Sequence, residues 1–236
     1  MTEASGMKVE VLDTAEAVAK RAADIIAGEA RVAVAARRRF VVAVSGGHTP
    51  WVMLRALSRL NVQWQAVDIV QVDERLAPRD DPDRNLKHLR ESLLEAPLSA
   101  ARIHEMPVES ADLKAGAAAY AATLQQLLGA SPLLDLVHLG LGPDGHTASL
   151  VPGDPVLAVE DADVAVTNPY QGKRRMTLTY PVLNRSRRIL WVVTGSEKAA
   201  ALRQLINGEP ATPAARVRRD GAVVVADNAA AAKLAS

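Results

Sequence analysis

The feature that most constrains the fold is a regular alternation of short apolar segments with helical patterns along the 236-residue chain. Most of the apolar segments are rich in valine and too short for buried helices, so we predict strands buried in a sheet. The predicted strands are Phe40–Val44, Val67–Val72, Leu133–Leu139, Met176–Tyr180, Ile189–Thr194 and Ala222–Ala226. Helical spacing is found in 13–38, after Pro50, and in 85–95, 111–128 and 196–206.

This alternation predicts an α/β fold with a mainly parallel sheet and right-handed crossovers. No linker, internal repeat or low-complexity segment divides the sequence, so we expect a single domain over residues 1–236. The stretch 152–173 contains proline and glycine, and we expect an irregular excursion from the regular pattern there.

The composition narrows the possible classes of function. A net charge of +1 gives no basis for binding nucleic acid or a membrane surface. The absence of cysteine excludes disulfides, thiolate metal sites and a cysteine nucleophile, and no apolar window is long enough to span a membrane. The first ten residues lack the apolar run of a signal peptide, so we expect a cytoplasmic protein.

Four polar clusters follow directly after predicted strands, namely Ser45–Thr49, Asp73–Arg75, Gly140–Thr147 and Thr194–Lys198. Ligands of open α/β sheets bind beyond the carboxyl ends of the strands. Because these ends meet at one edge when the strands are parallel, we expect the four clusters to form one site.

A predicted strand is joined to a predicted helix by Ser45-Gly46-Gly47-His48-Thr49-Pro50. The glycines let the backbone approach a ligand, and a helix N-terminus offers free N–H groups to an anion. Ser45 and Thr49 add hydroxyl groups. Phosphate binding and a simple tight turn with a capping hydroxyl are both consistent with this motif, whose spacing matches neither a Walker loop nor a dinucleotide fingerprint.

The charged residues at other strand ends also have two interpretations. Asp73-Glu74-Arg75 combines a guanidinium, which binds phosphate through paired donors, with two acids that can bind sugar hydroxyls or act as bases. A surface cluster of ion pairs is the commoner meaning of such a triplet. A run such as Lys173-Arg174-Arg175 is usually a solvated face, although one of the three could reach the phosphate. Lys198 lies in the first turn of a predicted helix, where a positive charge opposes the helix dipole and is accommodated either by an anion nearby or by solvent.

The segment Asp144-Gly145-His146-Thr147 indicates acid–base chemistry. An unperturbed histidine has a pKa of about 6.5 and accepts a proton from water near neutral pH. Asp144 can orient the ring, and glycine N–H groups can face a developing oxyanion. The alternative is that Asp144 caps a turn and His146 packs at the surface. No group of histidines and acids has metal-ligand spacing.

Together these motifs resemble the 6-phosphogluconolactonases, and the resemblance covers nearly the whole chain. It rests on Ser45–Pro50, on Asp73-Glu74-Arg75 with Pro78 and Asn85, on Gly140–Gly153, on Arg175–Thr179 with Pro181 and Asn184, and on Gly195 and Lys198. The resemblance implies a Rossmann-like sheet between helices, shared with glucosamine-6-phosphate deaminases and ribose-5-phosphate isomerases, with a small strand-containing excursion.

The resemblance also implies hydrolysis of 6-phospho-D-glucono-1,5-lactone to 6-phospho-D-gluconate, the second step of the oxidative pentose phosphate pathway. By this resemblance His146 activates the attacking water and Asp144 supports it, with Asp73 and Glu74 beside the sugar. The implied phosphate ligands are Arg75, Arg175 (or Arg174 in its place), Lys198, Ser45, Gly46, Gly47 and Thr49. No metal or organic cofactor is implied, and we expect a monomer or weak homodimer whose partner is the small-molecule lactone.

Two alternatives belong to other classes of function. Aminosugar-phosphate deaminase–isomerases share the fold, but they place a glutamate directly before the Pro-Gly where this chain has Val151, which cannot transfer a proton. A regulatory module that only binds sugar phosphates would not need both Asp144 and His146. The chain also departs from the family at Ala77 and at Arg84, which replaces the usual serine before Asn85 and leaves the role of that loop open.

Overall fold

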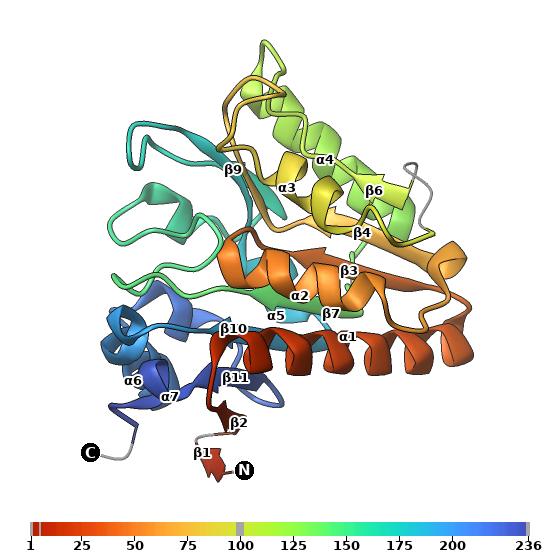
Figure 1. Ribbon diagram of the computed structural model, residues 1–236. Helices are drawn as coiled ribbons and strands as arrows, with labels where there is room; N and C mark the ends of the chain where they lie inside the picture. Colours follow the sequence, from red (N-terminus) through yellow and green to blue (C-terminus); the bar gives the residue numbers. More distant parts are fainter. Residues whose placement is uncertain (1, 5, 98–101, 235–236) are drawn as a thin grey trace.

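The computed structural model describes residues 2–4, 6–97 and 102–234 of the chain. Its centre is an eight-stranded sheet in which all neighbouring strands are parallel except the first two, which form an antiparallel pair at one edge (Figure 1). Across the sheet the order is β1 (Thr2–Ala4), β2 (Met7–Leu12), β11 (Val223–Asp227), β10 (Arg188–Val193), β7 (Leu136–Leu139), β3 (Phe40–Val44), β4 (Val67–Gln71) and β6 (Ile103–His104).

A second, antiparallel sheet of three short strands lies beside the large one. Its order is β5 (Asp73–Arg75), β9 (Arg175–Leu178) and β8 (Val164–Val166). Only Val72 separates β4 from β5, so the chain passes directly from the large sheet into the small one. The small sheet therefore holds Asp73–Arg75 at the edge where the parallel strands end.

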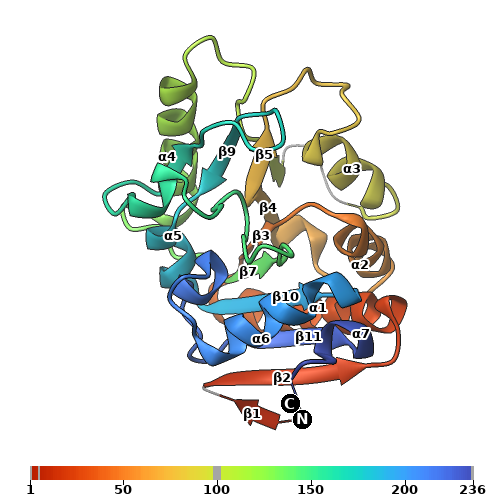
Figure 2. The ribbon, with the colours of Figure 1, turned by 90° about the vertical axis from the view of Figure 1, so that its left-hand side faces the viewer.

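Helices cover both faces of the large sheet (Figure 2). One face carries α1 (Ala15–Arg37), α2 (His48–Ser58) and α3 (Asn85–Ser92). The other face carries α4 (Leu113–Leu128), α5 (Tyr180–Arg185), α6 (Ala199–Asn207) and α7 (Asn228–Ala231). Short 3₁₀ helices cover Trp64–Ala66, Pro155–Ala158, Ser196–Lys198 and Pro213–Arg216. Among the described helices, none is long and apolar enough to cross a membrane.

The strand β3 shows how one apolar segment serves two cores. Successive side chains of a strand point to opposite faces of its sheet. Val41 and Ala43 accordingly pack in the core under α4–α6, whereas Phe40, Val42 and Val44 pack in the core under α1–α3. The continuous run of apolar residues is therefore explained by helices on both faces.

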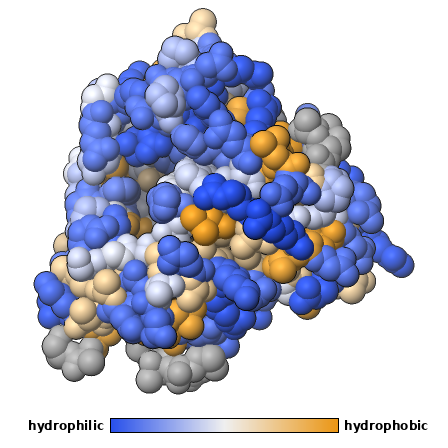
Figure 3. All heavy atoms as spheres, in the orientation of Figure 1, coloured by the Kyte–Doolittle hydropathy of each residue, from blue (hydrophilic) through white to orange (hydrophobic). Residues whose placement is uncertain are grey.

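The helix α1 covers the sheet with an alanine-rich stripe. It begins at the N-cap Thr14, whose hydroxyl accepts a hydrogen bond from the N–H of Ala17 at 3.1 Å. Ala19, Ala22 and other small residues on one side are buried, which lets the helix pack closely. The outward face of α1 and α2 shows hydrophilic residues with apolar ones between them (Figure 3).

The predicted α/β fold with a mainly parallel sheet is confirmed, and the predicted strands appear with ends shifted by up to three residues. Strands β1, β2, β5, β6 and β8 were not predicted. β2 alternates buried apolar with polar residues and so lacks a continuous apolar run, and the other four have at most three residues. The helix expected after Pro50 begins two residues earlier, at His48, because proline is tolerated in the first turn.

Candidate active site

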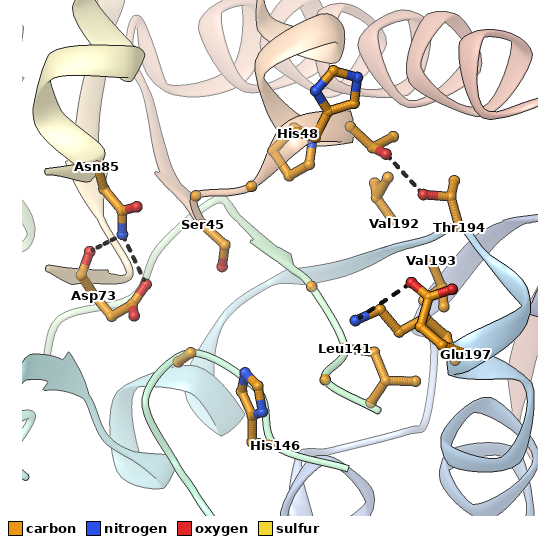
Figure 4. A pocket seen from close by; sticks show the side chains of 18 of the residues that line it. Ser45, His48, Asp73, Asn85, Leu141, His146, Val192, Val193, Thr194 and Glu197 are labelled. Carbon is orange, nitrogen blue, oxygen red and sulfur yellow. Dashed lines mark hydrogen bonds and ion pairs between the residues drawn. The ribbon is translucent and has the colours of Figure 1, made fainter. Parts of the chain in front are cut away.

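A cavity of about 390 Å³ opens where β3, β7 and β10 end and where the chain enters β5 (Figure 4). It is lined by residues of all four polar clusters together with Asn85, Ala148 and Arg175. The structure therefore brings the four clusters together at one edge of the sheet, as a parallel arrangement implies.

His146 and Asp144 form a hydrogen-bonded pair at this cavity. Nδ1 of His146 lies 2.6 Å from Oδ1 of Asp144. Burial raises the pKa of Asp144, but the hydrogen bond and charge of His146 and the Tyr170 hydroxyl outweigh it, so the net shift is downward. An ionised carboxylate only accepts hydrogen bonds, so Nδ1 carries the proton and Nε2 remains a proton acceptor. The ring of His146 projects towards the middle of the cavity (Figure 4).

The turn that carries this pair depends on glycine at position 142. A Cβ atom there would lie 2.0 Å from Nδ1 of His146, so any side chain would displace the ring. The N–H of Gly142 donates to the carbonyl of His146 at 2.8 Å, and the N–H of Gly145 donates to the carbonyl of Gly142 at 3.0 Å. Because these two N–H groups hold the turn, they are not free to face an oxyanion as the sequence suggested.

The N-terminus of α2 forms a second wall of the cavity. A Cβ atom at Gly46 would lie 2.1 Å from Oδ1 of Asn85, so the backbone can approach α3 only with glycine here. Within the described part of the chain, the amide N–H groups of Gly46 and Gly47 have no acceptor. Free amides at the positive end of a helix dipole favour an anion.

The hydroxyl groups of this wall are held in place. Oγ of Ser45 donates to the carbonyl of His138 at 3.1 Å, and the N–H of Ser45 donates to Nδ1 of the same histidine at 3.3 Å. Burial lowers the pKa of His138 to about 3, so this histidine is neutral. Its two hydrogen bonds with Ser45 hold the turn in place. Oγ1 of Thr49 lies 2.7 Å from Oγ1 of Thr194, which joins the first and fourth clusters.

Two arginines reach the cavity from the small sheet. Nη1 of Arg75 donates to the carbonyl of Asp83 at 3.0 Å and to Oδ1 of Asn85 at 2.8 Å. Arg175 is buried and its Nε has no hydrogen-bond partner among the described residues. Burial lowers the pKa of Arg175 from its ordinary value, with the charge of Asp73 opposing the shift. A buried guanidinium with a free donor beside a cavity is typical of an anion site.

Arg174, the alternative to Arg175, lies elsewhere. It is exposed, does not line this cavity, and donates from Nε to the carbonyl of Thr167 at 3.1 Å. Neighbouring residues of a strand point to opposite sides, so only one of the two arginines can enter the cavity. The structure favours Arg175.

Lys198 reaches the cavity from the opposite side. It ends the 3₁₀ turn before α6 and lies 4.0 Å from Glu197, measured from Nζ to Oε1. Both side chains line the cavity (Figure 4). The sequence indicated Lys198 but did not single out Glu197, since an acid in the first turn of a helix is ordinary.

The two acids of the second cluster point in different directions. Asp73 lines the cavity, and its Oδ2 accepts a hydrogen bond from Oγ of Ser149 at 2.6 Å. Glu74 does not line the cavity, although the sequence placed it beside the sugar. Side chains alternate along β5, so Asp73 and Arg75 face the cavity while Glu74 points the other way.

The carboxylate of Glu74 is instead completely buried under α3. It accepts hydrogen bonds from the N–H groups of Arg75, Asn85 and Leu86, each at 2.8 Å. The buried side chain of Arg84 lies 3.3 Å from the same carboxylate. Glu74 therefore caps the start of α3 and ties it to β5, and Arg84 contributes to this support rather than to the cavity.

Tyr170 is a residue of the site that sequence reasoning missed. Its hydroxyl donates to Oδ2 of Asp144 at 3.1 Å, and its ring contacts His146 and Arg175. A single aromatic residue in an irregular stretch gives no signal in the sequence, because Asp144 is 26 positions away. Across the described residues, no cluster of three or more histidine and acidic side chains forms that could hold a metal ion.

Comparisons with known proteins place this site in context. Residues 13–225 match the family described as glucosamine-6-phosphate isomerases/6-phosphogluconolactonase. A 6-phosphogluconolactonase from Synechocystis sp. is 36% identical over 207 residues, which is 86% of each chain. The crystal structure of a 6-phosphogluconolactonase from Shewanella baltica has a TM-score of 0.85 at 29% identity and covers 96% of this chain and 100% of that one.

A monomeric glucosamine-6-phosphate deaminase has a TM-score of 0.84 at 24% identity, over 96% of this chain and 100% of that one. This likeness confirms the expected fold, a mainly parallel sheet between helices with a small strand-containing excursion. Since both kinds of enzyme have this fold, the fold does not distinguish their activities. The family match extends over most of the sequence, and by that match the chain belongs to the family of glucosamine-6-phosphate isomerases and 6-phosphogluconolactonases.

Proposed function

We propose that the protein hydrolyses 6-phospho-D-glucono-1,5-lactone to 6-phospho-D-gluconate with a water activated by His146. The observation that carries the proposal is the single cavity that His146 shares with three cations, Arg75, Arg175 and Lys198. A phosphorylated lactone needs two things from its enzyme: a cationic region that binds the phosphate and a proton acceptor that activates water beside the uncharged lactone carbonyl. Both are present in this one cavity.

In the proposed mechanism, Nε2 of His146 takes a proton from water while the water oxygen bonds to C1 of the lactone. The carbonyl electrons move onto oxygen and form a tetrahedral oxyanion. When the carbonyl reforms, the bond between C1 and the ring oxygen breaks, and His146 returns the proton to that oxygen. Asp144 keeps Nδ1 protonated and stabilises the imidazolium that exists between the two transfers.

The phosphate end of the substrate would lie among the cations and the start of α2. Arg75, Arg175 and Lys198 supply charge, and the free amides of Gly46 and Gly47 supply neutral donors. Ser45 and Thr49 line the same wall; the hydroxyl of Ser45 already donates to His138, so Thr49, paired with Thr194, is the hydroxyl that can donate to the phosphate. Asp73 can accept hydrogen bonds from sugar hydroxyls, whereas Glu74, buried behind β5, takes no part in binding.

Lactone hydrolysis is favoured over deamination by Val151. This residue directly precedes Pro152-Gly153 and is nearly buried, with 7% of its surface exposed. A valine side chain carries no group that can move a proton, so the glutamate-dependent steps of a deaminase have no donor at this position. The curated relative from Synechocystis sp. is a 6-phosphogluconolactonase, which supports the same choice.

The test is a rate measurement with purified protein. The lactone opens spontaneously, so formation of 6-phosphogluconate must exceed the rate without protein. Unphosphorylated glucono-1,5-lactone serves as the control substrate, and we expect much slower turnover of it because the three cations would lack an anion. A phosphorylated lactone that opens no faster with the protein than without it would refute the proposal.

Arg175→Met should raise KM for the phosphorylated lactone by roughly 10- to 100-fold, the range expected for loss of a hydrogen bond to a charged group. The value of kcat should change less, because the contact is present in both the ground and transition states. Arg174→Met is the matched control, since its guanidinium lies outside the cavity. Equal rises in KM for both variants would contradict the assignment of Arg175.

A further inference from the structure

Tyr170 occupies the end of a tight hairpin between β8 and β9. Tyr170 and Lys173 exchange two backbone hydrogen bonds of 3.0 and 3.2 Å. Between them, Gln171 and Gly172 have φ values of 52° and 78°, the left-handed conformation of a two-residue hairpin turn. This geometry places the Tyr170 side chain against the turn that carries Asp144 and His146.

Three contacts of Tyr170 involve residues of the proposed site. Its hydroxyl donates to Oδ2 of Asp144 at 3.1 Å. Its ring meets the ring of His146 in an edge-on arrangement, with centroids 5.5 Å apart and planes at 63°. The guanidinium carbon of Arg175 lies 5.0 Å from the Tyr170 ring centroid, within the range of a cation–π contact.

We propose that Tyr170 is a positioning residue that holds the Asp144 carboxylate and the His146 ring in the geometry for proton transfer. This inference rests on the proposed function. Oδ1 of Asp144 faces His146, and the Tyr170 hydroxyl occupies Oδ2, so both oxygens of the carboxylate are engaged. Without the hydroxyl, one oxygen is released and the carboxylate can turn about its Cβ–Cγ bond.

The charges around Tyr170 suit this role. Burial raises the pKa of the Tyr170 hydroxyl, and the neighbouring carboxylate of Asp144 raises it further, so the hydroxyl stays a donor at neutral pH. The Arg175 guanidinium on the ring face opposes this shift only in part. Because Tyr170 does not line the cavity, it can act only through Asp144, His146 and Arg175.

The hairpin itself does not depend on the Tyr170 hydroxyl. Its backbone is closed by the pair with Lys173, and Nζ of Lys173 lies 2.5 Å from Oδ2 of Asp83 and 3.4 Å from Oδ2 of Asp81. These contacts anchor the hairpin to the loop before α3. Removal of the hydroxyl should therefore change the catalytic pair while the hairpin keeps its place.

The test begins with Tyr170→Phe in the full-length protein. We expect kcat to fall about tenfold, a loss typical of a displaced catalytic group, with KM and the thermal midpoint unchanged. The second measurement is the NMR signal of the Nδ1 proton of His146 in ¹⁵N-labelled protein. Its exchange with water should accelerate in the variant, because the carboxylate that holds it is freer. This readout does not require activity.

Tyr180→Phe is the matched control. Tyr180 also donates its hydroxyl, to the carbonyl of Pro213 at 2.9 Å, and also carries an arginine on its ring, Arg216 at 4.6 Å. It does not line the cavity, so its variant should lose thermal stability but keep kcat. Tyr170→Leu, which also removes the ring, should lower kcat further and raise KM because Arg175 loses its support.

The outcomes separate the two proposals. A kcat of Tyr170→Phe within twofold of the wild type, or a loss of kcat equal to that of Tyr180→Phe, overturns the positioning role. A lower kcat with an unchanged exchange rate of the His146 proton overturns it as well. If the wild-type protein does not accelerate lactone opening, the proposed function fails, whereas the NMR comparison still shows whether Tyr170 holds the pair.

Discussion

Replacing His146 with alanine should lower kcat for lactone hydrolysis by about 100- to 10,000-fold, the usual contribution of a positioned general base. The reason is that the ring of His146 projects into the cavity, and with Nδ1 donating to Asp144 the atom available to accept a proton is Nε2. The measurement is the rate of 6-phosphogluconate formation above the spontaneous rate. Affinity for the product, measured by calorimetry, should stay near that of the wild type because the three cations remain.

His88→Ala is the control for this prediction. His88 is a histidine outside the cavity lining, where Nε2 lies 2.7 Å from the carbonyl of Pro82, and its variant should have ordinary kinetics. A His146→Ala protein with near-normal turnover would remove His146 from the mechanism. Loss of product binding together with activity would indicate a damaged cavity rather than a missing base.

Glu74→Gln should lower the free energy of unfolding by about 3–5 kcal/mol, the cost of breaking a buried ion pair by removing one partner. The variant keeps the shape of the side chain but removes the buried counter-charge of the Arg84 guanidinium, which then has, among the described acidic residues, only the exposed Glu109, 3.8 Å away. It also weakens the hydrogen bonds that the carboxylate accepts from the N–H groups of Asn85 and Leu86 at the start of α3. Urea denaturation of the purified protein measures the change.

Two further proteins make this prediction specific. Glu95→Gln removes the acid from an ion pair with Arg59 in which both side chains are exposed. The midpoint of its urea denaturation should not change appreciably. The double variant Glu74→Gln/Arg84→Met should recover part of the loss, because it no longer buries a guanidinium that has lost its buried partner. An unchanged stability of Glu74→Gln would mean that the buried carboxylate contributes nothing to the join between β5 and α3.

Sequence reasoning found the site residues that come soon after a predicted strand, because the strand itself shows at which edge of the sheet they lie. Ser45, Asp73 and His146 each follow an apolar strand, and parallel strands end at the same edge, so their meeting follows from local patterns. The choice of Arg175 over Arg174 did not follow from such local patterns. It depends on which side of β9 faces the cavity, and the register with β5 decides that.

Glu74 shows the same limit more clearly. In the sequence it stands between two residues of the cavity and looks equivalent to them. A strand of only three residues is too short for an alternating pattern to be visible, so the sequence could not show that the middle side chain points away. Five strands, β5 among them, were missed for related reasons, because they are short or alternate apolar with polar residues.

The sequence by itself determined the α/β class, the mainly parallel sheet and the edge at which the polar clusters meet. These follow from the periodicity of apolar residues and from turn residues, which act over a few positions of the chain. Only the tertiary structure decided that Glu74 supports α3, that Arg175 enters the cavity and that Tyr170 reaches Asp144. Those contacts join residues distant in sequence, or depend on which face of a strand is turned inward, and both are set when the elements pack together.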